Sequence, residues 1–203
     1  MKYIPSILLF FFLLSFSSCS TKTVESELPE PNPPTPVIPE EPTPEKEKML
    51  WFDAEANFER FSKKENITYY LDLAKSTGFN KIVVDVRPVQ GDALFKSSYL
   101  TPLTDLAGTH IERDWNYLQF FIDEAHKREL KVTVSATIFT AGLPSSKNGM
   151  AYRDDTWDGK TCLEYTKDQG LIDIKDDKTK VSAFLNPVLP EVQDFCLNFI
   201  KEL

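Results

Sequence analysis

The sequence predicts an α/β fold built on parallel strands, and two observations support this class. Segments rich in β-branched residues alternate with segments whose apolar residues recur every three or four positions, in the order strand, helix, strand, helix, strand. The connections between the strands are also long enough to hold a helix, as parallel strands require, whereas antiparallel hairpins need only a few residues. We therefore expect βαβ units with three main parallel strands.

The three strands are predicted at residues 49–54, 81–88 and 131–139. The middle one reads Lys-Ile-Val-Val-Asp-Val-Arg-Pro, in which β-branched residues dominate and a proline ends the run. Nothing in the predicted order protects the edge of the third strand, although proteins normally cover such an edge.

Three helices are predicted from their end signals and their apolar stripes. The first begins at a capping box opened by Ser62 and stops before Gly78. Asp114 is the expected N-cap of the second helix, and Pro190 begins the third. The residues that we expect to face the core recur at helical spacing and are Ile67, Tyr70, Leu71 and Ala74, then Trp115, Leu118, Phe121, Ile122 and Ala125, then Val192, Phe195, Cys196, Phe199 and Ile200.

The segment from Thr140 to Pro187 is longer than ordinary loops, which rarely exceed about 15 residues without structure or function. Within it, residues 171–174 are expected to form part of a small hairpin. Of the cysteines in the domain, Cys162 falls in this loop and Cys196 on an apolar helix face. We expect both to be free thiols, with a disulfide as the alternative.

Residues 1–18 have the three zones of a signal peptide: a charged start at Lys2, an apolar run over residues 7–16, and small residues before Cys19. A membrane-spanning helix would need roughly 20 apolar residues, and this segment turns polar at Ser17. Permanent anchoring by the helix and cleavage to a plain secreted protein are the two alternatives.

Residues 19–48 are predicted to be a linker, because eight of the fourteen prolines fall between Pro29 and Pro44. An extended polyproline-like chain rises about 3.1 Å per residue, so this segment is either a stalk that gives reach or an inert spacer. Residues 49–203 are enough for one domain with its own core. The net charge of −8 and the absence of a basic stripe argue against nucleic acid as a partner.

The stretch Phe16-Ser17-Ser18-Cys19 resembles the lipobox of bacterial lipoproteins. The resemblance implies that Cys19 is lipidated and is the first residue of the mature chain. The membrane, reached through this lipid, is then an expected partner, because acyl chains hold soluble domains at a surface. The expected location is the bacterial cell envelope, lipid-anchored at the outer membrane or the cell surface.

Residues 78–95, 121–128 and 185–192 are similar, in order and spacing, to a glycosyl hydrolase-like family related in name to glycoside hydrolase family 10. These are bacterial envelope proteins with a TIM-barrel domain. The resemblance implies that residues 49–203 are the N-terminal portion of a (βα)₈ barrel that hydrolyses a polysaccharide or the peptidoglycan glycan. Where the family has glycine, this chain has Glu129. Because such a barrel needs about 250 residues, we expect a family member truncated after the third βα unit. Whether this part is an active enzyme by itself is not decided by the resemblance.

Alternation along the strands selects the candidate catalytic residues. Trp51, Asp53 and Glu55 share one side of the first strand, and Asp85 and Arg87 share one side of the second. Glycoside cleavage needs two carboxyl groups, so Asp53, Glu55 and Asp85 are the predicted catalytic residues, with an essential acid beyond this chain as a further expectation. We expect Arg87 to pair with Asp85 and to bind sugar hydroxyls, or else to form a structural ion pair.

Three further residues are predicted to bind substrate. Trp51 and Trp157 offer rings on which the CH face of a sugar stacks, with plain core packing as the alternative for Trp51 and loop anchoring for Trp157. Asp92 follows Gly91 after the second strand, and its alternative is an ordinary turn. We expect no cofactor, because the sequence has no glycine-rich phosphate loop, and no metal, because the two histidines, His110 and His126, come without a third ligand.

Two other hypotheses compete with a metal-independent glycoside hydrolase. The chain can instead be a noncatalytic glycan-binding lipoprotein that keeps the aromatic residues without the acid pair, or an inactive fragment.

Overall fold

The computed structural model describes residues 46–203. The predicted signal peptide, the lipidation site at Cys19 and nearly all of the linker lie outside the described residues.

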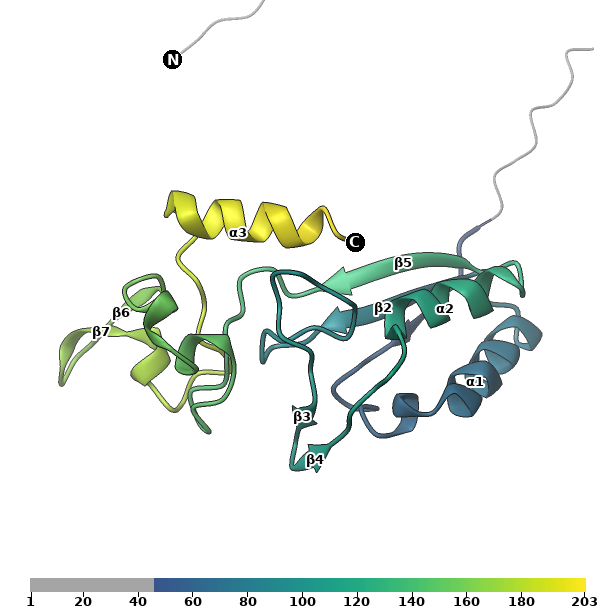
Figure 1. The fold of residues 1–203 in the computed structure, drawn as a ribbon, viewed down its shortest axis with the longest axis horizontal. Coiled ribbons are helices and arrows are strands. Elements are labelled where there is room, and N and C mark those ends of the chain that lie inside the picture. The colour runs from purple at the N-terminus through teal and green to yellow at the C-terminus, as the bar shows by residue number, and fades with distance from the viewer. Residues whose placement is uncertain (1–45) are drawn as a thin grey trace, which may run out of the picture. The chain divides into compact units, whose positions relative to one another are not determined.

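The core of the fold is a parallel sheet of three strands, β1 (Met49–Phe52), β2 (Lys81–Arg87) and β5 (Lys131–Ala136), in the spatial order β1-β2-β5 (Figure 1). Phe52 is aligned with Val84 in the register of β1 and β2, and β5 continues parallel on the other side of β2. The predicted parallel arrangement is therefore confirmed. It agrees with the first units of a barrel, while the full count of eight strands stays a prediction.

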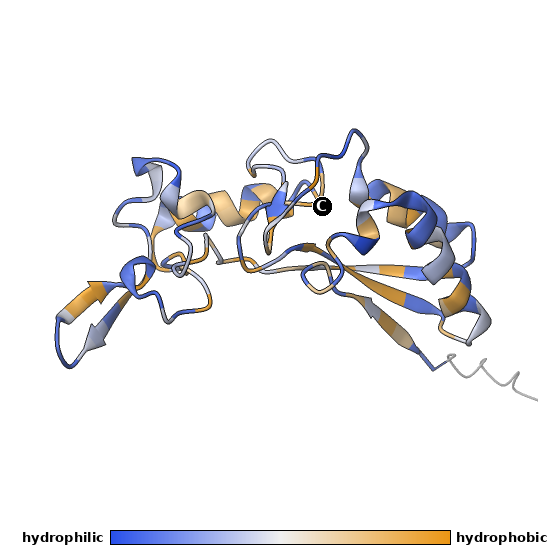
Figure 2. Ribbon diagram, turned by 90° about the horizontal axis from the view of Figure 1, so that it is seen from below, coloured by the Kyte–Doolittle hydropathy of each residue, from blue (hydrophilic) through white to orange (hydrophobic). Residues whose placement is uncertain are grey.

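Two helices, α1 (Lys64–Ser76) and α2 (Tyr117–His126), lie next to each other against one face of this sheet (Figure 1). Ile82, Val84 and Val86, alternate residues of β2, are completely buried. Figure 2 shows hydrophobic and hydrophilic residues changing along the strands. The residues of this core include Phe52, Ile67, Leu71, Ile82, Val84, Val86, Phe121 and Ala125. Burial of these apolar side chains supplies the main driving force for the fold.

The capping box predicted at Ser62 is wrong. Ser62 ends a short 3-10 helix, η1 (Arg60–Ser62), and its hydroxyl donates to the carbonyl of Glu59 at 2.6 Å, so it is not free to cap α1. Lys63 occupies the N-cap position without a side-chain hydrogen bond. The predicted end is confirmed, since Gly78 has a φ of 86°, which favours glycine.

The predicted cap of α2 is also displaced. Asn116, not Asp114, is the N-cap, and its side chain accepts a hydrogen bond from the Gln119 amide at 3.2 Å. After α2 the chain turns through Glu129, whose φ of 55° lies in the left-handed region. Because a non-glycine residue is disfavoured at such a φ, the departure from glycine at this position strains the backbone.

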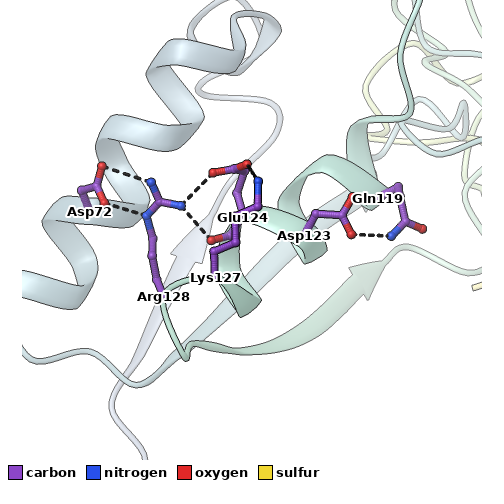
Figure 3. Close-up of polar contacts among 6 residues, drawn as sticks. All are labelled: Asp72, Gln119, Asp123, Glu124, Lys127 and Arg128. Atoms are coloured by element: carbon purple, nitrogen blue, oxygen red, sulfur yellow. Dashed lines mark hydrogen bonds and ion pairs between the residues drawn. The ribbon is translucent and has the colours of Figure 1, made fainter.

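A charged network joins the C-terminal turn of α2 to α1 (Figure 3). Arg128 donates to both carboxylate oxygens of Asp72 on α1, at 2.7 and 3.2 Å, and to Glu124 on α2 at 2.8 Å. Lys127 also contacts Glu124, at 2.6 Å. Because the guanidinium plane matches a carboxylate with two donors, this contact fixes the orientation of the two helices as well as their distance.

The two long connections contain small elements of their own. The first, between β2 and α2, holds a short hairpin of β3 (Asp105–Leu106) and β4 (Thr109–His110). The second, between β5 and α3 (Pro190–Ile200), holds the predicted hairpin, together with three 3-10 helices; its elements are η2 (Met150–Tyr152), η3 (Asp155–Trp157), β6 (Leu163–Thr166), β7 (Gly170–Asp173) and η4 (Ile174–Asp176).

α3 begins at Pro190 as predicted and buries Val192, Cys196 and Phe199. The prediction that Ile200 faces the core is wrong, because this residue is 41% exposed at the last turn of the helix. Cys162 and Cys196 are both free, as expected. Among residues 46–203, no helix combines the length and the hydrophobicity needed to cross a membrane.

Candidate active site

Three carboxylates gather on the face of the sheet opposite α1 and α2. Along β1 and the turn after it, Trp51, Asp53 and Glu55 are exposed, whereas the intervening Phe52 and Ala54 are buried. The alternation predicted from the sequence is thus confirmed for this strand. Trp51 is 59% exposed, so it is not part of the described core.

Asp85 joins this group from the middle strand. Burial first, and the negative charges of Asp53 and Glu55 after it, raise its pKa from the ordinary value of 3.8 to about 6, against backbone amides of Ala54 and Arg87 that favour the ionised form. Because the charges of Asp53 and Glu55 both act on the pKa of Asp85, the three predicted catalytic residues lie near one another at the ends of the first and second strands.

Backbone amides hold the two carboxylates of the first strand in place. The Ala56 amide donates to Asp53 Oδ1 at 2.9 Å, and the Val89 amide donates to Glu55 Oε1 at 2.8 Å. Glu55 therefore links the loop after β1 to the loop after β2. Both loops follow the carboxyl ends of parallel strands, where barrel enzymes carry their active sites.

This arrangement can perform acid–base chemistry close to neutral pH. A desolvated carboxyl group with a pKa near 6 keeps its proton in mildly acidic solution and can donate it to a bound substrate. Within residues 46–203, no three histidine, cysteine, aspartate or glutamate side chains are grouped in a way that would hold a metal ion.

A sequence profile described as glycosyl hydrolase-like 10 matches residues 47–203. The chain belongs to this glycosyl hydrolase-like family. It is 32% identical over 168 residues to an S-layer-related protein of Niallia circulans, a match that covers 78% of this chain and 10% of that protein. It is 29% identical over 135 residues to the glycosyl hydrolase DigH of Escherichia coli K12, covering 66% of this chain and 29% of that protein. The chain thus spans less than a third of the length of either relative.

Arg87, expected in the glycosyl hydrolase-like site, lies elsewhere. It is completely buried, and its guanidinium donates to the carbonyl oxygens of Thr137, Ile138 and Thr140 and stacks on the Phe199 ring at 4.9 Å. The predicted pair with Asp85 is wrong. The register of β2 against β5 shifts between residues 85 and 87, and such a bulge breaks the alternation from which the pair was predicted.

Asp92 and Trp157 come together in a different place from the three carboxylates. Both line a cavity of about 260 Å³ between the loop after β2 and the segment before α3. Asp92 is 2% exposed and forms an ion pair with Arg153, so it is not the ordinary exposed turn residue of the alternative interpretation. Arg153 was missed because it carries no motif and lies 61 positions away from its partner.

Tyr117 is a second residue that sequence reasoning missed. It is 2% exposed at the first position of α2, and its hydroxyl has no hydrogen-bond partner among the described residues. Burial raises its pKa above the usual range, and the charges of Asp85 and Asp53 add to this effect. The effect of these charges shows that the Tyr117 hydroxyl lies within electrostatic range of the carboxylates. Its position outside the helical stripe that we considered explains why the sequence did not identify it.

Proposed function

We propose that this chain is the first part of a glycan-hydrolysing domain, in which Asp85 donates a proton to the leaving oxygen and Asp53 or Glu55 acts as the ionised carboxylate. The observation that carries the proposal is the raised pKa of Asp85 beside two further carboxylates. Cleavage of a glycosidic bond requires this combination of one protonated and one ionised carboxyl group.

The other features of this face support a sugar as the substrate. Trp51 exposes more than half of its surface on the carboxylate side of the sheet. An aromatic ring stacks on the CH face of a sugar while neighbouring carboxylates accept hydrogen bonds from its hydroxyls. The membership in a glycosyl hydrolase-like family agrees with this interpretation, and the whole protein's activity on a polysaccharide or the peptidoglycan glycan is part of the proposal.

The proposal is tested by measuring new reducing ends after the full chain is incubated with soluble polysaccharides and with peptidoglycan glycan strands. We expect Asp85→Asn to lower the rate by about 100-fold or more, the usual contribution of a general acid. Asp168→Asn is the matched control, because Asp168 is exposed at the tip of the hairpin of β6 and β7. Hydrolysis that survives in Asp85→Asn at the unmodified rate would overturn the assignment.

A second candidate function, glycan binding without cleavage, is favoured by the exposure of Trp51. It predicts that the chain binds a glycan without releasing reducing ends. In that case Trp51→Ala weakens binding, whereas Asp85→Asn leaves the amount of reducing ends unchanged at zero.

We also propose that the protein is a lipoprotein of the bacterial cell envelope, carried on a lipid at Cys19 and separated from the membrane by the proline-rich linker. The support is the three-zone leader and the small residues before Cys19. Labelled palmitate added to bacteria that express the full chain should enter the protein and should be absent from Cys19→Ala. Equal labelling of the two proteins would contradict lipidation at this residue.

A further inference from the structure

The cavity that contains Asp92 and Trp157 combines charged, polar and aromatic groups. Its volume is about 260 Å³, and its wall includes Asp92, Tyr99, Arg153, Asp154 and Trp157. This is slightly smaller than the roughly 300–1,000 Å³ of pockets for drug-sized ligands, so it suits a small ring. Its residues come from two connections that are far apart in the sequence.

The polar side of this cavity is an ion pair between the buried Asp92 and the partly exposed Arg153, and it has unused hydrogen-bonding capacity. Asp92 accepts hydrogen bonds at Oδ2 from Gln90 and Arg153, while its buried Oδ1 has no partner among the described residues. Arg153 also donates to Thr101 Oγ1 at 3.0 Å, and about a third of its side chain is exposed. Of the five N–H groups of a guanidinium, two are accounted for by these contacts within residues 46–203. The partly exposed guanidinium of Arg153 therefore keeps N–H groups that can donate to a ligand in the cavity.

The aromatic side is held in place by α3. The Trp157 ring packs against Phe195 with 4.7 Å between centroids and 68° between planes. Lys160 lies over the Trp157 ring at 5.6 Å but does not line the cavity. Tyr99 adds a second ring that is 50% exposed. These rings give the cavity an apolar wall opposite its charged groups.

The chemistry of the wall selects among ligand classes. The carboxylates of Asp92 and Asp154 disfavour an anion, the guanidinium of Arg153 disfavours a cation, and an apolar molecule would remove water from all three groups without offering them a hydrogen bond. A neutral sugar ring satisfies the wall, because its hydroxyls donate to carboxylates and accept from arginine while its CH face stacks on an aromatic ring. We propose that this cavity binds one sugar unit of a glycan.

This proposal rests on the proposed function and adds a holding site to it. Asp92 follows Asp85 by only seven positions along the chain, in the loop after β2, so the cavity opens on the same connection that Glu55 contacts through Val89. A long glycan held by one sugar unit here keeps its other units at a raised effective concentration near the carboxylates. The cavity itself takes no part in bond cleavage.

Calorimetric titration of the full chain with glucose, galactose, N-acetylglucosamine and their β-1,4-linked dimers tests the proposal. We expect at least one of these sugars to bind in a 1:1 ratio. Tyr99→Ala should weaken that binding about three- to tenfold, the usual value of one aromatic contact. Tyr165→Ala is the matched control, because Tyr165 is 78% exposed on β6 and does not line the cavity.

Two further variants keep the test independent of folding and of hydrolysis. Trp157→Phe retains a ring against Phe195 and should still weaken binding, and Asp168→Asn, at the exposed tip of the hairpin of β6 and β7, should leave the binding constant unchanged. Absence of binding by every sugar, or equal binding by Tyr99→Ala and Tyr165→Ala, would overturn the sugar site without affecting the proposed hydrolysis. The opposite result is also informative. If the chain binds a sugar in the cavity but hydrolyses no glycan, the proposed hydrolysis is contradicted and the sugar site is not.

Discussion

Replacing Asp85 by asparagine is expected to stabilise the protein at neutral and alkaline pH. Because burial and neighbouring charges raise the pKa of Asp85 from 3.8 to about 6, the folded state binds the proton more tightly than the unfolded state. The resulting stabilisation is complete below about pH 4 and is lost as the pH rises through about 6. Above that pH the folded protein carries an ionised group in an unfavourable environment, and an amide removes this cost.

The size of the effect follows from the shift. About two pKa units correspond to about 3 kcal/mol, at about 1.4 kcal/mol for each unit. Asp85 is only partly buried, so solvent screening reduces this figure, and we expect Asp85→Asn to be more stable by about 1–2 kcal/mol at about pH 8. At about pH 4 the difference between the two proteins should fall by the same amount, because the wild-type carboxyl is then protonated.

Urea unfolding followed by tryptophan fluorescence at about pH 4, 6 and 8 measures this difference. Asp168→Asn serves as the control, because Asp168 is exposed and should give the same small difference at each pH. If the free energy of unfolding of Asp85→Asn relative to wild type does not change with pH, the pKa of Asp85 is not raised and the proposed general acid loses its basis.

Three further predictions concern the local structure and are checked by the free energy of unfolding in urea. Glu129→Gly should stabilise the chain by about 1 kcal/mol, because glycine adopts the φ of 55° without strain; a lower stability would refute this. Arg128→Met should cost about 1–2 kcal/mol through loss of the contact between α1 and α2, whereas Lys127→Met, at the exposed edge of the same network, should cost less than about 0.5 kcal/mol. Asn116→Ala should cost about 1 kcal/mol as the loss of a helix cap, and an equal cost for Asp114→Ala would contradict the assignment of the cap.

The comparison of the two helix caps shows why local patterns predict elements better than their ends. Ser62 and Asp114 are both good capping residues with helical patterns after them. The structure uses neither as a cap. The Ser62 hydroxyl donates to the carbonyl of Glu59 instead, and α2 begins three positions after Asp114. The choice between neighbouring capping residues depends on how the preceding loop packs, which no local pattern encodes.

The carboxylates of the candidate site were predictable from the sequence, whereas their polar surroundings were not. Asp53 and Glu55 follow from the alternation predicted for residues 49–54, although β1 ends at Phe52 and both lie in the turn after it, and Asp85 follows from the same rule on the next strand. Arg87 departs from the rule because a bulge intervenes after Asp85. The burial that raises the pKa of Asp85 comes from the packing of several segments, so it has no signature in the strand itself.

The sequence by itself determined the order of strands and helices, the parallel sheet, the carboxylate side of β1 and the hairpin of β6 and β7, because hydrophobic periodicity and turn residues act over short distances along the chain. Only the tertiary structure decided that Arg87 is buried under α3, that Arg153 pairs with Asp92, and that Trp157 and Tyr99 share one cavity. These contacts join residues more than fifty positions apart, and they depend on how whole segments pack against one another, which the local sequence does not specify.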